Sequence, residues 1–235
     1  MTAMNWEMYE SHVLILCDTL AIGEDRRPAF MTTKVFYWPH LGACVAGTGA
    51  QPMAQNLYMR VNGRMVVRDV LHLDEYAPKV LQELWADLLA ENDDRPDATC
   101  TIYLFGWSEA EGRFVGFAYR STAQFASERL GYGLAIKPAP DDEQIFDKIN
   151  DLESFVRLVQ IQKAEDRARP RLERIGIGGE VVMTLLTRDE AGYVGAQQKV
   201  LSRFDDHEDD WRLLLSKLPE NAGHPLSAML LAMDP

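Results

Sequence analysis

The spacing of apolar residues changes in blocks along this chain, and this order constrains the fold more than any other feature. Strand-like runs occupy about the first fifty residues, and helical spacing then continues to about residue 90. More strand-like runs, one long helical stretch and a last pair of strands follow. Because strands and helices form separate blocks instead of alternating, the pattern predicts an α+β fold with antiparallel sheets, not a doubly wound parallel sheet.

Several stretches predict particular elements. Residues 12–18, HVLILCD, are apolar almost throughout, as in a strand that is covered on both faces. The stretch AIGEDRRPAF, residues 21–30, reads as a polar loop. Two strand-like runs on either side of Ser108–Glu111 predict a β-hairpin. Residues 141–168 carry the strongest helical pattern, with Asp141 or Asp142 as the expected N-cap.

Size and charge limit the class of protein. A chain of 235 residues can bury one large core, so we expect a main domain over residues 1–200. Residues 201–235 are expected to form a C-terminal helical appendage with an apolar tail. The net charge of −12 argues against a nucleic-acid partner, which would need a basic face. No apolar run approaches the roughly 18 residues of a membrane helix, and the N-terminus has no signal-peptide pattern, so we expect a cytoplasmic protein without a membrane partner.

Motifs for metals and cofactors are weak. The five histidines include no pair with the spacing of metal ligands. The GTG at residues 47–49 is too short for a phosphate or dinucleotide loop. The sequence therefore predicts neither a cofactor nor a metal site.

Three strand-like stretches each carry, near one end, a residue that could take part in catalysis. HVLILCDT carries Asp18, TTKVF carries Lys34 and GACVAGTG carries Gly47. Together with IYLFGWSEAEGRFVGFAYR and IGGEVVMTLL, they resemble a 20S-proteasome-type β subunit of the N-terminal-nucleophile (Ntn) hydrolase superfamily over roughly residues 2–190. The resemblance implies a four-layer αββα sandwich, in which two antiparallel sheets face each other and helices cover both.

The same resemblance implies a catalytic set of Thr2, Asp18, Lys34 and Gly47. Thr2 to Asp18 and Asp18 to Lys34 are both intervals of 16 positions, as in the family. Thr2 would be the nucleophile, and its own α-amine, once free, would be the base that a weak hydroxyl nucleophile needs. Lys34 would supply positive potential, Asp18 would pair with Lys34, and the Gly47 N–H would stabilise an oxyanion. The implied reaction is hydrolysis of peptide or amide bonds through an acyl-threonine.

Two readings of this set stay open at the level of sequence. Met1 precedes Thr2, so the amine is free only if the methionine is removed. The stretches that match the family's serine-bearing loops, GYGLAIKPAP and RIGIGGEV, contain no serine. The alternative is therefore a catalytically inactive subunit in which Asp18 and Lys34 form a structural ion pair. In either reading, we expect a homo-oligomer, with a ring as one arrangement.

Overall fold

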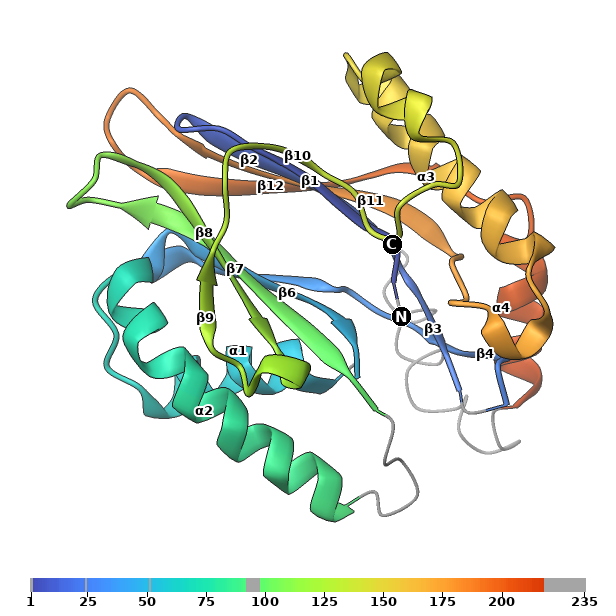
Figure 1. Cartoon of the computed structure of the whole chain (residues 1–235), viewed down its shortest axis with the longest axis horizontal. Helices are drawn as coiled ribbons and strands as arrows, with labels where there is room; N and C mark the ends of the chain where they lie inside the picture. The colour runs from blue at the N-terminus through green and yellow to red at the C-terminus, as the bar shows by residue number, and fades with distance from the viewer. Residues whose placement is uncertain (1, 24, 51, 92–97, 218–235) are drawn as a thin grey trace, which may run out of the picture.

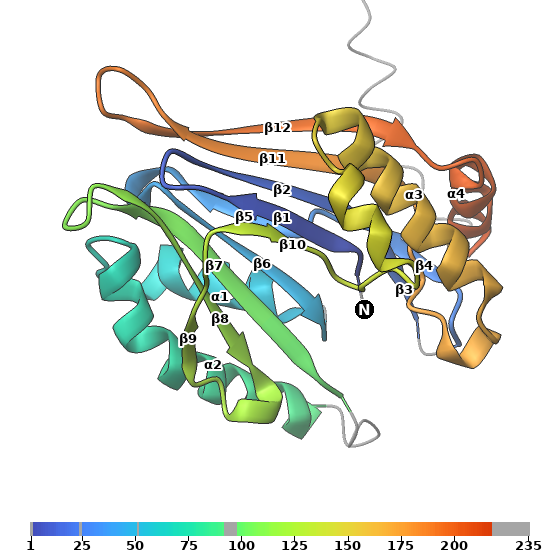
Figure 2. The ribbon, with the colours of Figure 1, turned by 45° about the horizontal axis from the view of Figure 1, so that its top comes forward.

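The computed structural model describes residues 2–23, 25–50, 52–91 and 98–217 of the 235-residue chain. One antiparallel sheet has the strand order β10-β1-β2-β11-β12, with the long β11–β12 hairpin at one edge (Figures 1 and 2). Its strands are β1 (Met4–Met8), β2 (His12–Asp18), β10 (Gly133–Ala135), β11 (Glu180–Arg188) and β12 (Val194–Arg203).

A second antiparallel sheet has the order β5-β6-β7-β8-β9. The hairpin expected around Ser108–Glu111 is confirmed, because β7 and β8 pair on either side of it. The strands are β5 (Val35–Trp38), β6 (Ala43–Gly49), β7 (Cys100–Ser108), β8 (Arg113–Arg120) and β9 (Ser127–Arg129).

The stretch expected to be a polar loop forms a third sheet. β3 (Leu20–Ile22) pairs with β4 (Pro28–Met31), and only the turn between them is polar. The apolar residues at its two ends, Leu20–Ile22 and Pro28–Met31, are enough for a short two-stranded ribbon. The expectation of a four-layer αββα sandwich made of two sheets is therefore wrong: the described residues form three antiparallel sheets, of five, two and five strands.

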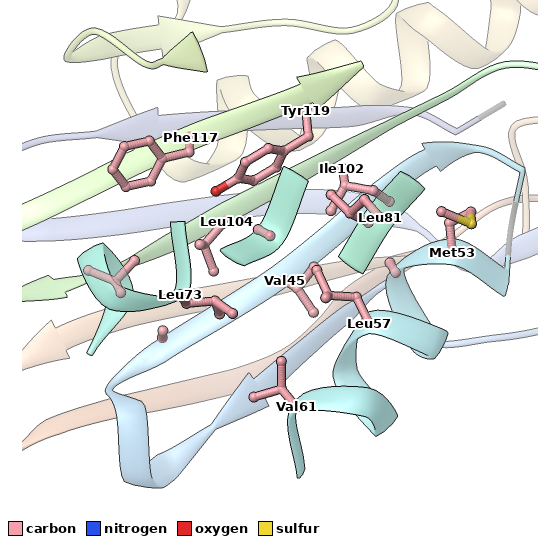
Figure 3. Close-up of a cluster of buried hydrophobic side chains, with 14 of the residues drawn as sticks. Val45, Met53, Leu57, Val61, Leu73, Leu81, Ile102, Leu104, Phe117 and Tyr119 are labelled. Carbon is pink, nitrogen blue, oxygen red and sulfur yellow. The ribbon is translucent and has the colours of Figure 1, made fainter. Parts of the chain in front are cut away.

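Helices α1 (Pro52–Arg64) and α2 (Val70–Glu91) cover one face of the β5–β9 sheet (Figure 1). Their apolar faces pack on residues that point outward from that sheet, and Figure 3 shows this core. It includes Val45, Met53, Leu57, Leu73, Leu81, Ile102, Leu104 and Tyr119. Burial of these faces, rather than helix propensity, accounts for most of the stability of such amphipathic helices.

The two five-stranded sheets also share a core. Trp6 of β1 lies with its ring centroid 4.6 Å from that of Tyr103 and 5.8 Å from that of Phe105, both on β7. Cys17 of β2 and Cys44 of β6 belong to the same buried cluster. The inward faces of the two sheets are thus in contact, which brings the end of β2 close to the start of β5.

Helix α3 (Leu152–Ala168) packs on the β10–β12 sheet through Phe155, Leu158 and Val159. The prediction that it begins at Asp141 or Asp142 is wrong, because a separate 3₁₀ helix, Glu143–Lys148, precedes it. Asp151 is the N-cap: its side chain accepts from Ser154 N, and Ser154 Oγ accepts from Asp151 N. This reciprocal capping box starts the helix nine or ten residues after the expected N-cap at Asp142 or Asp141.

Helix α4 (His207–Ser216) follows β12 and lies against β4. It falls in the region expected to be a helical appendage, whereas the expected apolar tail lies outside the described residues. Three short 3₁₀ helices complete the described elements: Pro39–Leu41, Ser121–Ala123 and Arg171–Glu173. Within the described part of the chain, no helix is long and apolar enough to cross a membrane.

Candidate active site

Asp18 and Lys34 form a buried ion pair. Asp18 is the last residue of β2, and Lys34 directly precedes β5. Lys34 Nζ lies 2.9 Å from Asp18 Oδ1 and also donates to the Leu20 carbonyl at 2.8 Å. Asp18 is fully buried and Lys34 is 8% exposed. A charge pair in such a position is retained only when hydrogen bonds satisfy both partners, as they do here.

The Asp18 carboxylate also fixes the backbone of two other segments. Ala3 N donates to Oδ1 at 3.1 Å, and Gly178 N donates to Oδ2 at 3.1 Å. The Ala3 carbonyl accepts from Asp18 N at 3.3 Å. Asp18 therefore holds the start of β1, the loop before β11 and the Lys34 ammonium together, and Thr2 is the residue immediately before this anchor.

Thr2 lines a small cleft with Lys34 and Gly47. The cleft has a volume of about 50 Å³, and Thr2 itself is buried, with 7% of its surface exposed. Its remaining walls include the apolar side chains of Leu20, Ile22 and Phe36. The structure thus brings three of the four residues singled out by sequence onto one cleft and places Asp18 behind Lys34.

Gly47 lies near the end of β6, opposite Ile102 of β7. A Cβ atom at this position would lie 2.9 Å from Ala54 Cβ and 3.2 Å from Ile102 Cδ1. The first distance is shorter than real Cβ contacts, so a glycine is required for α1 to approach the sheet here. The close approach of α1 forms one wall of the cleft.

Asp166, near the end of α3, is a site residue that the sequence analysis missed. Its carboxylate accepts three backbone N–H groups, from Ile175 at 2.6 Å, Gly176 at 2.8 Å and Ile177 at 3.3 Å. These residues lead directly into Gly178, whose N–H binds Asp18. Asp166 is 3% exposed, although an acidic residue in the last turn of an amphipathic helix would normally be expected to face solvent.

Cys17 is the other potential nucleophile beside the ion pair. Burial raises the pKa of its thiol to about 12, more than Lys34 lowers it. The thiol is therefore neutral near pH 7, and a neutral thiol is a poor nucleophile. In the described part of the chain, no group of His, Cys, Asp and Glu residues is arranged to hold a metal ion.

Comparison with known proteins identifies the fold. No protein-family model matches the chain. No curated protein matches it either. Solved structures do match: Anbu from Pseudomonas aeruginosa in a helical assembly (15% identity, TM-score 0.58) and Anbu, named an ancestral beta-subunit, from Yersinia bercovieri (12%, 0.57), each over 100% of this chain and 98% of the other. Anbu from Hyphomicrobium sp. strain MC1 matches at 14% identity and TM-score 0.57, over 94% of this chain and 100% of the other.

These matches identify the fold of the chain, which is similar to that of Anbu proteins. They also correct the resemblance drawn from sequence. The matching structures described above are Anbu proteins, the resemblance to a 20S-proteasome β subunit is not directly shown, and identities of 12–15% show a common fold alone.

Proposed function

We propose that the chain is a threonine hydrolase that cleaves peptide or amide bonds with Thr2 as its nucleophile. The observation that carries this proposal is that Thr2, Lys34 and Gly47 line one cleft, with the buried Asp18 behind Lys34. A hydroxyl, a cation and a strand-end glycine are the groups that acyl transfer through an N-terminal nucleophile requires.

In the proposed reaction, Thr2 Oγ attacks the carbonyl carbon and its proton passes to the Thr2 α-amine. Lys34, 2.9 Å from Asp18 Oδ1, keeps a positive charge at the cleft and favours loss of that proton. The Gly47 N–H stabilises the negative oxygen of the tetrahedral intermediate. The ammonium at Thr2 then gives its proton to the leaving amine, and water hydrolyses the acyl-threonine.

The proposal requires removal of Met1, because an amide nitrogen at Thr2 cannot act as a base. The first test is the intact mass of untagged protein, which should be lower by one methionine. The second test is labelling with a peptide vinyl sulfone, which should modify Thr2, as identified by peptide mapping. Retention of Met1 in fully folded protein, or labelling that is unchanged in Thr2→Ala, would overturn the mechanism.

Two variants separate catalysis from folding. Thr2→Ser keeps a hydroxyl and should keep measurable peptide hydrolysis, whereas Thr2→Val has nearly the same shape as threonine and should have none. Both should unfold at similar urea concentrations, because the backbone anchor next to this residue is Ala3 N to Asp18. Equal loss of activity and stability in both variants would indicate a structural role for Thr2 instead.

A second candidate is a catalytically inactive subunit, and the geometry of Asp18 favours it. The carboxylate holds β1, Lys34 and the Gly178 loop at once, so the pair has a structural role whether or not Thr2 reacts. The two candidates differ in one result. An inactive subunit would show no vinyl sulfone labelling even after removal of Met1.

We also propose that the chain self-associates in the cytoplasm, with residues 1–200 as the hydrolase domain and residues 201–235 as an appendage. The support is the fold it has in common with an Anbu protein from Pseudomonas aeruginosa that was solved as a helical assembly. Native mass spectrometry of the full chain tests this proposal. A monomer as the only species would contradict it.

A further inference from the structure

Lys137 is a partly buried lysine that the proposed mechanism does not use. It lies two residues after β10, and its carbonyl accepts a hydrogen bond from Met4 N of β1 at 2.8 Å. Its side chain reaches the other five-stranded sheet, because Nζ lies 3.3 Å from Thr101 Oγ1 and 3.4 Å from Tyr103 OH, both on β7. The place of the ammonium between the two sheets is therefore fixed by contacts with each of them.

The first of these contacts puts Lys137 beside Thr2. Met4 belongs to the core between the two sheets, whereas Ala3 packs in the cluster under α3. Since side chains of a strand alternate between its faces, Thr2 points to the same side as Met4, towards the second sheet. The β1–β10 register, continued by two residues, puts Lys137 opposite Met4, and Figure 2 shows the chain leaving β10 next to the start of β1. Lys137 is thus a diagonal neighbour of Thr2, a relation that long side chains can span.

The second contact leads to the same cleft from the other side. Thr101 of β7 pairs with Thr48 of β6. The two glycines that flank Thr48 line the cleft that holds Thr2. The Lys137 ammonium, next to the Thr101 hydroxyl, therefore lies one strand away from the cleft wall.

The charge of Lys137 has no carboxylate to offset it. Among the described residues it forms no ion pair, and its ammonium is near two neutral hydroxyls and the Tyr103 ring, 5.7 Å from the ring centroid. Burial, and then the nearby Arg120 guanidinium, lower the pKa of this lysine from its ordinary value. Arg120 has its own partner, Glu128. A positive site thus lies beside the cleft of a protein whose net charge is −12.

We propose that Lys137 binds an acidic side chain of the peptide substrate, and so gives the candidate hydrolase a preference for aspartate or glutamate near the cleaved bond. The inference rests on the function proposed for Thr2. A partly buried ammonium has lost some of its water, and neutral hydroxyls replace that water only in part. A carboxylate supplies the missing charge and accepts strong hydrogen bonds from the ammonium, whereas a glutamine side chain of similar shape does not.

The test measures peptide binding to full-length Thr2→Ala protein, which lacks the proposed nucleophile. Rhodamine-labelled oligoalanine peptides carry one glutamate at successive positions, and peptides with glutamine at the same position are the matched controls. Fluorescence anisotropy should show that glutamate binds about tenfold more tightly than glutamine at one position of the series, as expected for a hydrogen bond to a charged group. Equal affinities at every position, or no binding, would overturn the proposal.

Three variants in the same background test the assignment. Lys137→Gln should remove the preference for glutamate, and Lys137→Arg, which keeps the charge, should retain it. Lys79→Gln, at an exposed position of α2, should leave the preference unchanged. A preference that survives Lys137→Gln would show that another group binds the carboxylate.

Hydrolysis of the same peptides by the protein with Thr2 intact separates this inference from the proposed function. Selective binding of glutamate peptides without any hydrolysis would overturn the hydrolase proposal and support Lys137 as a peptide-binding residue. Hydrolysis with equal kcat/KM for glutamate and glutamine peptides would support the hydrolase proposal and overturn the role of Lys137.

Discussion

Lys34 Nζ and Asp18 Oδ1 lie 2.9 Å apart in an interior where Asp18 has no exposed surface. Asp18 is the last residue of β2 in one five-stranded sheet, and Lys34 directly precedes β5 in the other. This pair therefore links the two sheets. Because Ala3 and Gly178 bind the same carboxylate, the pair also sets the position of Thr2. The geometry of the candidate site and the stability of the fold therefore depend on the same atoms.

Removal of Lys34 should destabilise the protein strongly. Lys34→Met leaves Asp18 buried without its cation, which should lower the free energy of unfolding by about 3 kcal/mol. Urea denaturation measures this loss. The double variant Asp18→Asn/Lys34→Met should be more stable than Lys34→Met alone, because no unpaired charge remains. Additive losses in the double variant would show that the two residues do not act as a pair.

A methyl group at Gly47 should be costly for packing. Its Cβ would lie 2.9 Å from Ala54 Cβ, so Gly47→Ala should lower the free energy of unfolding by about 1–3 kcal/mol. The matched control is Gly63→Ala in α1, where a Cβ meets nothing within 4 Å. That change should stabilise the helix by about 0.5 kcal/mol. Adding Ala54→Gly should recover part of the Gly47→Ala loss, and no recovery would contradict the contact.

Asp166 should stabilise the loop of residues 175–178, which ends in the hydrogen bond from Gly178 N to Asp18. Asp166→Ala leaves the N–H groups of Ile175, Gly176 and Ile177 without their acceptor, which should cost about 2–4 kcal/mol. Hydrogen exchange should accelerate at Gly178 in this variant. The control is Asp147→Ala, at an exposed position of the preceding 3₁₀ helix, and it should change neither quantity. An unchanged rate of hydrogen exchange at Gly178 in Asp166→Ala would show that Asp166 does not stabilise the loop that binds Asp18.

Glu111 should make stability depend on pH in the acid range. Hydrogen bonds from Arg129 and then Arg113 lower its pKa from 4.5 to about 2. A carboxyl with a lowered pKa stabilises the fold above its ordinary pKa, and this contribution is lost as the pH falls from about 4.5 towards 2. The side chain is partly exposed, so screening limits the contribution to about 1 kcal/mol or less.

NMR titration of the Glu111 carboxyl measures that pKa directly. Glu111→Gln should lower the free energy of unfolding at pH 7, and the difference from the parent protein should shrink at acid pH. Glu109→Gln is the control, because Glu109 is 70% exposed and lies 4.0 Å from Arg188. A pKa near 4.5 for Glu111 in the folded protein would contradict the prediction.

Sequence alone determined the local elements and the spacing of the candidate site. The β7–β8 hairpin follows from two strand-like runs around a polar turn, and α1 and α2 follow from helical spacing of apolar residues. These patterns report which face of one element is buried, and that information is contained within a few consecutive residues. The equal intervals between Thr2, Asp18 and Lys34 were also visible there.

Only the tertiary structure decided how these elements meet. The capping box that starts α3 at Asp151 is a local signal that the apolar periodicity does not show, whereas the third sheet depends on pairing of β3 with β4. Gly178 became a site residue because the fold brings it to Asp18, 160 positions away in the chain, and Asp166 contributes by holding the loop that leads into Gly178. Such hydrogen bonds leave no periodic trace in the sequence, because their partners are set by topology and not by neighbouring residues. The same reason hid a cavity between β12 and α4, whose walls come from five separate segments of the chain.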